Sequence, residues 1–174
     1  MVAFLTGRAC GETEESRVIV VRAVPEDIPE WLKLAAEVEY LFGPMLSDPG
    51  FKSALERGIR RETAFCIRRA GGPPGAPLLG GLLWSPHPPV YTVGWLSVAS
   101  GARRQGVASA LLQHVLALVT PPAEIVVTTF GEDVVDGQAA RLLYKRLGFV
   151  PLAEDVPDGP EGGSRQKFRK TVTA

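Results

Sequence analysis

One stretch of the sequence, residues 90–119, constrains the fold more than any other, because its hydrophobic periodicity changes in the middle. Residues 90–98 alternate along the chain, which predicts a β-strand with two faces. One face carries Tyr91, Val93, Trp95 and Ser97, and the other carries Val90, Thr92, Leu96 and Val98. From Val107 to Val119 the apolar residues recur at every fourth position, which predicts one buried face of a helix. The stretch therefore predicts a strand, a short turn and a helix.

The turn between these two elements, residues 103–108 (RRQGVA), is basic and nearly free of bulky side chains. The first backbone N–H groups of a helix lack internal partners, and the helix dipole places partial positive charge there. Gly106 and Ala108 let a ligand approach this backbone, and Arg103 and Arg104 add full charges. The turn is therefore predicted to bind an anion such as a pyrophosphate.

The composition sets broad limits on the class of protein. A chain of 174 residues predicts one domain with a core large enough to be stable alone. Lys+Arg and Asp+Glu both number 19, and this balance argues against a nucleic-acid partner. No apolar run suits a membrane helix or a signal peptide, so no membrane partner is expected. Cys10 and Cys66 lack metal-site spacing, which predicts no metal and a reducing, cytoplasmic location.

The other segments alternate between strand and helix patterns. Further strands are predicted over 17–24, 63–69, 78–84, 124–130, 149–150 and 165–172, and further helices over 25–42, 50–60 and 138–147. Short turns at 71–77 and 85–89 predict an antiparallel meander, and Gly80-Gly81 predicts a bulge within it. The helix after residue 106 allows strands 90–98 and 124–130 to lie parallel as a right-handed crossover. The expected fold class is α+β, with a mixed, mostly antiparallel sheet and helices on both faces.

Two motifs narrow the choice among phosphate-binding folds. Neither G-x-G-x-x-G nor G-x-x-x-x-G-K-[ST] occurs in the chain. Instead, residues 103–108 resemble the Q/R-x-x-G-x-G/A acyl-CoA motif of the GNAT superfamily of N-acyltransferases. Residues 140–149 (ARLLYKRLGF) are similar to the A-x-x-L-Y-x-x-x-G-F element that closes the cofactor site in that family. The order of the motifs, with one strand between them, also matches, and the resemblance covers nearly the whole chain.

The resemblance implies a three-layer α/β architecture in which the central parallel strands splay apart and acyl-pantetheine lies between them. The backbone of residues 96–98 would bind the pantetheine, and residues 104–109 would hold the pyrophosphate. The implied cofactor-binding residues are Leu96, Ser97, Val98, Arg103, Arg104, Gln105, Gly106, Val107, Ala108, Ser109 and Tyr144. Tyr144 matches the family tyrosine near the thioester sulfur and is the candidate catalytic acid. Where the family commonly has an asparagine the chain has Gly137, with Gln138 or Asp136 as candidate substitutes.

The activity implied by the resemblance is transfer of an acetyl group from acetyl-CoA to a primary amine. The amine attacks the thioester directly in a ternary complex, in a single domain over residues 1–174 with a loosely held extension at 1–16. The acceptor is a small-molecule amine or a protein amine, and a homodimer is possible. One alternative is a catalytically idle acyl-CoA-binding or sensing module on the same fold. Another is a phosphate-binding domain unrelated to CoA.

The sequence leaves the acceptor side of the site open. Candidates for the general base, besides a chain of water molecules, are Glu39, Asp48, Glu132, Asp133 and His87. The acidic residues Glu37, Glu39 and Asp48 suit a cationic amine and suit a solvated surface equally. The aromatic residues that either line an acceptor pocket or belong to the core are Trp31, Tyr40, Phe42 and Trp84. Cys66 is predicted to be a small core residue.

Overall fold

The structure is a computed structural model that describes residues 18–174, so the predicted extension over 1–16 lies outside the described residues. One sheet of seven strands forms its centre, in the order β1-β2-β3-β4-β5-β7-β6. The strands are β1 Val20–Arg22, β2 Ala64–Arg68, β3 Leu78–His87, β4 Val90–Val98, β5 Ala123–Phe130, β6 Val150–Pro151 and β7 Arg165–Val172. All neighbours are antiparallel except β4 and β5, which are parallel. The predicted mixed sheet is confirmed.

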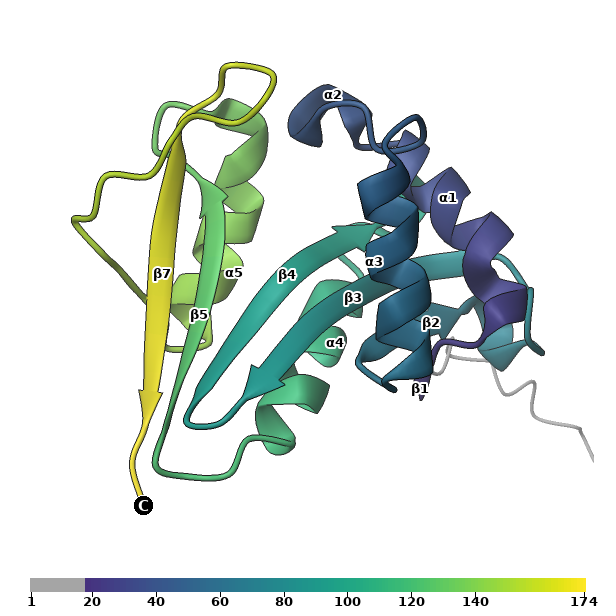
Figure 1. Cartoon of the computed structure of the whole chain (residues 1–174), viewed down its shortest axis with the longest axis horizontal. Helices are drawn as coiled ribbons and strands as arrows, with labels where there is room; N and C mark the ends of the chain where they lie inside the picture. Colours follow the sequence, from purple (N-terminus) through teal and green to yellow (C-terminus); the bar gives the residue numbers. More distant parts are fainter. Residues whose placement is uncertain (1–17) are drawn as a thin grey trace, which may run out of the picture.

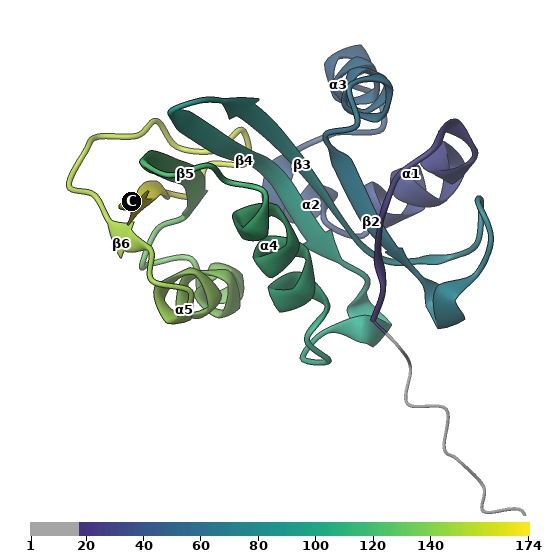
Figure 2. The same cartoon turned by 90° about the horizontal axis from the view of Figure 1, so that it is seen from below.

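Helices cover both faces of this sheet. They are α1 Ile28–Ala36, α2 Glu39–Phe42, α3 Pro49–Arg60, α4 Val107–Ala117 and α5 Gln138–Arg146. The first three lie on one face, and α4 and α5 lie on the other (Figures 1 and 2). The three-layer arrangement follows from the amphipathic patterns, because α1, α3, α4 and α5 each bury one face against the sheet.

The predicted helix over residues 25–42 is wrong as a single element. A 3-10 turn at Pro25–Asp27 precedes α1, and α1 ends at Ala36. Val38 then leaves the helical region, with φ −122° and ψ 7°, and places its side chain in the core. The chain therefore bends between α1 and α2, and this bend carries α2 toward the end of the sheet.

Gly80 and Gly81 let the helices approach both faces of β3 closely. A Cβ on Gly80 would lie 2.7 Å from Val107 of α4, and one on Gly81 would lie 2.8 Å from the Trp31 ring of α1. The predicted irregularity is found beside this pair, because β2 pairs with Gly80 and then with Leu78. Strand β3 continues through the predicted turn at 85–89 as far as His87.

The core consists of two clusters on opposite faces of the sheet. One contains Leu111 and Leu112 of α4 with Phe168 of β7, and the other contains Trp31 of α1 and Leu55 of α3. Cluster residues are almost fully buried, as the close packing of a protein interior requires. Within residues 18–174, no helix has the length and apolar character needed to span a bilayer.

An ion pair that the sequence analysis did not predict joins the start of α1 to the sheet. Asp27 is fully buried and accepts hydrogen bonds from Nε and Nη2 of Arg68 at 2.9 and 2.7 Å. Its carboxylate also accepts from the backbone N–H groups of Val24 at 2.9 Å and Gly75 at 3.0 Å. Burial alone would raise the pKa of Asp27, but these hydrogen bonds offset burial and hold the pKa below 3.8. The pair therefore fixes α1 and the β2–β3 loop onto β2.

We expect Asp27→Asn to lower the free energy of unfolding by about 3 kcal/mol at pH 7, because it leaves the largely buried Arg68 guanidinium without its charge partner. Since the folded-state pKa of Asp27 is depressed, its stabilising effect is complete above 3.8 and is lost as the pH falls through the folded-state value. Urea unfolding at pH 7 and at about pH 3 measures the difference. The control is Glu62→Gln, which breaks an exposed pair with Arg22 and should cost under about 1 kcal/mol. Equal stability of Asp27→Asn and wild type at pH 7 would contradict this role.

Candidate active site

Strand β4 contains one residue that has no partner in the neighbouring strand β3. Val93 lies opposite Trp84 and Trp95 lies opposite Leu83, so Gly94 has no residue opposite it in β3. An extra residue of this kind is a β-bulge, which bends its strand and moves the following side chains to the other face. Gly94 is exposed, although it lies in the middle of the sheet.

The predicted alternation of β4 is correct before the bulge and wrong after it. Tyr91 belongs to the core cluster under α4, whereas Trp95 belongs to the cluster under α1 and α3. Leu96 and Val98 pack against the α4 cluster, on the face that the sequence pattern had assigned away from Tyr91. The prediction failed because the extra residue at Gly94 shifts the pattern by one position.

Strands β4 and β5 separate at the same point. Their parallel pairing runs from Val90↔Glu124 to Val93↔Val127 and then stops, although β4 continues to Val98 and β5 to Phe130. Figure 1 shows the two strands diverging from there toward their carboxyl ends. The edge of β4 beyond Gly94 therefore faces a gap instead of a neighbouring strand.

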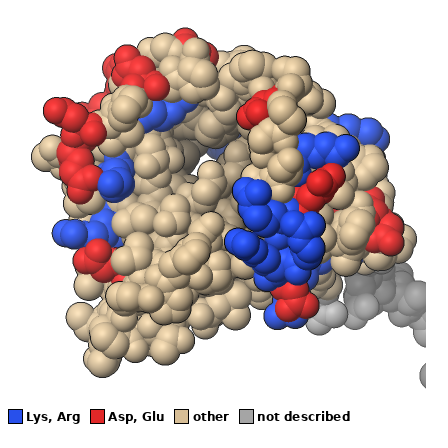
Figure 3. All heavy atoms as spheres, in the orientation of Figure 1, with Lys and Arg blue, Asp and Glu red and all other residues tan. Residues whose placement is uncertain are grey.

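The gap passes through the molecule as a small opening, visible in the space-filling view (Figure 3). Its far end is bridged by α2 and the segment that leads into β7. Nη2 of Arg165 donates to the carbonyl of Leu41 at 2.9 Å, and the rings of Phe42 and Phe130 lie 5.2 Å apart. The Arg165 guanidinium also lies over the Phe130 ring, 4.6 Å from its centroid. These contacts close the gap into an opening that joins the α3 side of the sheet to the α4 side.

Helix α4 begins at the end where the strands have separated. A 3-10 turn at Ser100–Ala102 follows β4, and residues 103–106 then form an exposed turn into α4. Arg104 and Gly106 have positive φ values of 64° and 81°, a conformation that turns successive N–H groups toward one side. Gly106 is the N-cap, and no side chain caps the helix. The first N–H groups of α4 are therefore available to an anion.

The side chains of this turn reinforce its shape. Nε of Arg103 lies 3.5 Å from the carbonyl of Val98, and Nε2 of Gln105 donates to the carbonyl of Gly101 at 3.0 Å. Both arginines of the turn are exposed. The predicted cofactor-binding residues at 96–98 and 103–109 are thus continuous along one edge, from the free edge of β4 to the first turn of α4.

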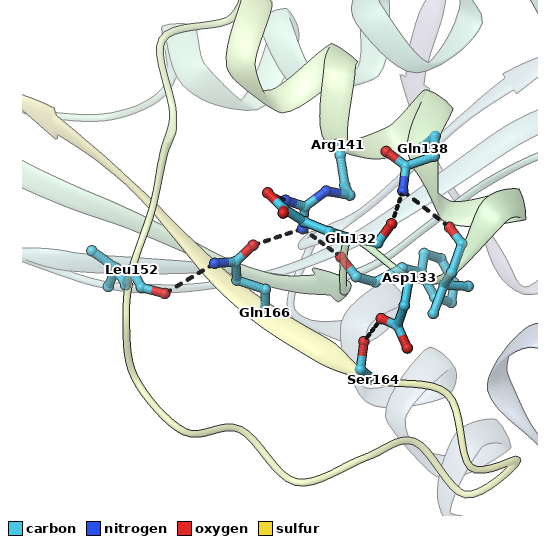
Figure 4. Close-up of polar contacts among 9 residues, drawn as sticks. Glu132, Asp133, Gln138, Arg141, Leu152, Ser164 and Gln166 are labelled. Carbon is cyan, nitrogen blue, oxygen red and sulfur yellow. Dashed lines mark hydrogen bonds and ion pairs between the residues drawn. The ribbon is translucent and has the colours of Figure 1, made fainter.

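A buried arginine fixes the opposite wall of the gap (Figure 4). Arg141 is only 2 % exposed, and its Nη1 donates to the carbonyl of Phe130 at 2.8 Å and to Gln166 at 2.7 Å. Its Nη2 donates to Glu132 at 2.9 Å, and its guanidinium lies 5.1 Å from the Phe168 ring centroid. The helical spacing of the apolar residues in α5 predicts that Arg141 faces outward, and this prediction is wrong. Because the end of β5 has lost the neighbouring β4, its last carbonyl needs another donor, and Arg141 supplies it.

Tyr144 lies one turn beyond Arg141 on α5. It is 3 % exposed and packs against Phe149 and Phe168, with ring centroids 5.5 and 6.2 Å away. Burial raises the pKa of its phenol above the usual 10, so the group stays protonated at neutral pH. Its hydroxyl makes no hydrogen bond with any of residues 18–174.

The comparisons with known proteins agree with this arrangement. The Acetyltransferase (GNAT) domain matches residues 61–151, which is more than half of the chain and includes β4, the turn and α5 up to Pro151. This chain belongs to the GNAT acetyltransferase family. No curated protein sequence is similar enough to be matched to it.

Solved structures of GNAT proteins share its fold. A ribosomal-protein-alanine N-acetyltransferase from Brucella melitensis is 17 % identical, with a TM-score of 0.69, and the match covers 89 % of this chain and 100 % of that one. A protein described as histone acetyltransferase HPA2 and related acetyltransferase, from Corynebacterium glutamicum, is 22 % identical, with a TM-score of 0.61 and coverages of 90 % and 97 %. A chain of the NatC complex bound to Gag peptide and CoA is 19 % identical, with a TM-score of 0.68 and coverages of 90 % and 99 %. At these identities the similarity establishes the fold.

The GNAT asparagine position is occupied here by a glycine for a steric reason. A Cβ on Gly137 would lie 2.2 Å from the side chain of Phe130, so this position has no room for a larger residue. Gln138, one candidate substitute, donates to the carbonyls of Glu132 at 2.6 Å and Val134 at 3.3 Å. It therefore stabilises its own loop. Asp136, the other candidate, is exposed.

The carboxylates predicted to act as a base or to attract a cationic amine mostly have backbone partners. Glu37 accepts from the N–H of Ser100 at 2.7 Å, and Glu39 accepts from the N–H of Leu46 at 2.7 Å. Asp48 caps α3 by accepting from the N–H of Gly50 at 2.8 Å. These contacts hold the loops around α2 and α3 in place.

The remaining candidates for the general base lie at opposite ends of the sheet. Glu132 and Asp133 follow β5 at the open end, where Glu132 pairs with Arg141 and Asp133 accepts from the Ser164 hydroxyl (Figure 4). His87 ends β3, next to the turn into the paired part of β4, and is therefore remote from the gap.

Most of the other aromatic and thiol candidates are core residues. Trp31 is 0 % exposed and Trp84 is 6 % exposed, whereas Tyr40 is 58 % exposed on α2. Cys66 is fully buried, and burial raises the pKa of its thiol to about 12, which makes it unsuitable as a nucleophile. Of the four aromatic candidates, Phe42 contacts the end of the gap through Phe130.

We expect Gly106→Ala to weaken acetyl-CoA binding about tenfold, because a side chain disfavours the positive φ that orients the N–H groups of the turn. Gly162→Ala is the matched control, since Gly162 also has a positive φ, of 89°, and open space around a Cβ. Both substitutions introduce the same backbone strain, but only Gly106 lies in the turn before α4. Isothermal titration calorimetry with acetyl-CoA measures the affinities. Equal losses in the two variants would mean that the turn does not bind the ligand.

Proposed function

We propose that this protein is an N-acetyltransferase that transfers the acetyl group of acetyl-CoA to a primary amine by direct attack. The observation that carries the proposal is the separation of β4 and β5 at Gly94, beside the uncapped first turn of α4. An extended substrate chain and its phosphates can be bound there along one continuous edge. Membership of the GNAT family supports acyl transfer as the chemistry.

The free edge of β4 suits the pantetheine arm of acetyl-CoA. Beyond Gly94 the strand still pairs with β3 on one side, from Trp95↔Leu83 to Val98↔Gly80, but has no strand on the other. The amide groups of an extended arm can pair with such an edge as an added strand does. Leu96, Ser97 and Val98 would then bind the arm, and Arg103, Arg104, Gln105, Gly106, Val107, Ala108 and Ser109 would bind the pyrophosphate.

Catalysis of this reaction depends mainly on positioning the amine against the thioester. The amine nitrogen attacks the thioester carbon, the C–S bond breaks, the thiolate takes up a proton, and the amine gives one up. Entry of the amine from the α3 side of the opening, with the thioester on the β4 edge, would bring the two reactants together. A backbone N–H near residues 96–98 would stabilise the oxyanion that develops on the carbonyl.

Tyr144 is the proposed donor to the departing thiolate. Its raised pKa keeps the phenol neutral and hence able to donate. The same low-dielectric surroundings would raise the proton affinity of a thiolate formed beside it, so the two groups remain comparable in basicity. The free hydroxyl has no competing acceptor among residues 18–174. Tyr144 would also contact the sulfur end of the cofactor.

The alternative is an acyl-CoA-binding module of the same fold that does not transfer the acetyl group. It predicts binding of acetyl-CoA without thiol release in the presence of any amine. The two functions are separated by combining calorimetry with a thiol-release assay over a panel of small amines and peptides. Binding with turnover supports the enzyme, binding alone supports the module, and no binding at sub-millimolar acetyl-CoA excludes both.

We expect Tyr144→Phe to lower kcat about a hundredfold with little change in acetyl-CoA affinity, because the substitution removes only the donated proton. Tyr91→Phe is the control. Tyr91 is also a buried phenol on the α4 side of the core, but its hydroxyl accepts from the N–H of Thr120 at 3.3 Å, in the paired part of β4. Thiol release measures kcat, and calorimetry measures affinity. Unchanged turnover in Tyr144→Phe would contradict the acid role of Tyr144. That result would not bear on the proposed cofactor site, which calorimetry tests separately.

A further inference from the structure

The surface of α3 that borders the acceptor side of the sheet is positively charged. Figure 3 shows a group of Lys and Arg side chains over α3. This group lies on the same visible face as the opening. The basic residues of this helix and its C-cap are Lys52, Arg57, Arg60 and Arg61. The one acidic residue within α3, Glu56, lies 3.9 Å from Lys52. The charge here is therefore opposite to the one expected for a site that attracts simple cationic amines.

Two of these arginines line a pocket between α3 and the β3–β4 hairpin. The pocket has a volume of about 240 Å³, which is enough for a small polar group with its carbon chain. Its lining includes Arg57 and Arg61 from the end of α3, the rings of Phe51 and Trp95, and Gly94 of β4. Arg57 and Arg61 are the charged members of this lining, and no Asp or Glu balances them.

The arginine side chains of the pocket are available to a ligand. Arg57 and Arg61 are exposed, and neither side chain forms an ion pair or a hydrogen bond within residues 18–174. They are four residues apart, so they emerge on the same side of the chain at the end of α3. The walls beside them are apolar, with the Phe51 ring 5.6 Å from that of Trp95. A planar guanidinium beside such walls binds a carboxylate more strongly than it would in open water.

The pocket also reaches the point at which β4 and β5 separate. Gly94 lines the pocket and is the residue at which β4 leaves β5. A molecule with an anionic group in this pocket would therefore have its other end near the edge proposed to hold the thioester. Acetyl-CoA would occupy the opposite, α4 side, so the two molecules would not compete for this space.

We propose that Arg57 and Arg61 bind a carboxylate of the acceptor, and that the acceptor is a small primary amine bearing a carboxylate. This inference rests on the proposed N-acetyltransferase function and specifies its substrate class. The arginines act in binding, so they lower KM for such acceptors and leave the chemical step to the β4 edge. The alternative is that the two arginines bind no ligand and only interact with the helix dipole at the carboxyl end of α3.

The test compares ω-amino acids of two to six carbons with their carboxamides, which differ only in the negative charge. Thiol release is measured with wild type, Arg57→Gln, Arg61→Gln and the matched control Arg60→Gln. Arg60 is on the same last turn of α3 but lines a different cavity, with Arg22, Glu56 and Glu62. We expect at least one ω-amino acid to exceed its carboxamide about tenfold in kcat/KM, through KM. Arg57→Gln and Arg61→Gln should remove this preference, and Arg60→Gln should retain it.

Equal kcat/KM for ω-amino acids and carboxamides in wild type would overturn the inference while leaving the transferase intact. An equal loss in Arg60→Gln would overturn it as well, because the effect would then belong to the helix dipole. If no amine is acetylated, binding of glutarate is followed by tryptophan fluorescence, since the Trp95 ring lies on the α3 face and lines the pocket. Glutarate binding that depends on Arg57 and Arg61 but not on Arg60 would support the anion site although the proposed function had failed. Absence of such binding would overturn the site.

Discussion

The arrangement of this molecule depends on one extra residue in a central strand. Gly94 forces β4 to bulge while β4 stays paired to β3, so the strand cannot also follow β5 beyond Val93. A sheet interrupted in this way exposes backbone groups at its centre, which is normally costly because buried N–H and C=O groups need partners. In the GNAT fold this unpaired edge suits a substrate that can supply those partners. The constraint that weakens the sheet thus also creates the edge at which we propose that acetyl-CoA binds.

Other contacts hold the two halves of the sheet at a fixed separation. Gly80 and Gly81 let α4 and α1 pack closely on the β4 half. On the β5 half, Arg141 replaces the lost strand partner at the carbonyl of Phe130. Arg165 joins the halves at the far end through the carbonyl of Leu41. The two arginines supply donors to carbonyls beside the gap, and the two glycines allow close packing on the neighbouring strand, so these contacts hold the two halves of the sheet in place.

The sequence predicted the parts of this structure that depend on periodicity and on short motifs. The strand–turn–helix over residues 90–119, the crossover to β5 and the mixed sheet all follow from local patterns, and the two motifs pointed to the right family. The failures share a cause. The face switch at Gly94, the break at Val38 and the burial of Arg141 depend on partners distant in the sequence, which no local pattern reveals. The roles of Glu37, Glu39 and Asp48 were ambiguous for the same reason, because their backbone partners became evident only with the loops in place.

We propose that the edge of β4 beyond Gly94 and the first turn of α4 together bind acetyl-CoA. Amide hydrogen exchange, measured with and without saturating acetyl-CoA, tests it most directly, because exchange reports on backbone N–H groups one segment at a time. If acetyl-CoA binds there, exchange should become slower in residues 94–98 and 104–109, with little change in β1 and in the paired part of β3. Binding of acetyl-CoA that leaves both segments unprotected, or protects only one of them, would contradict it.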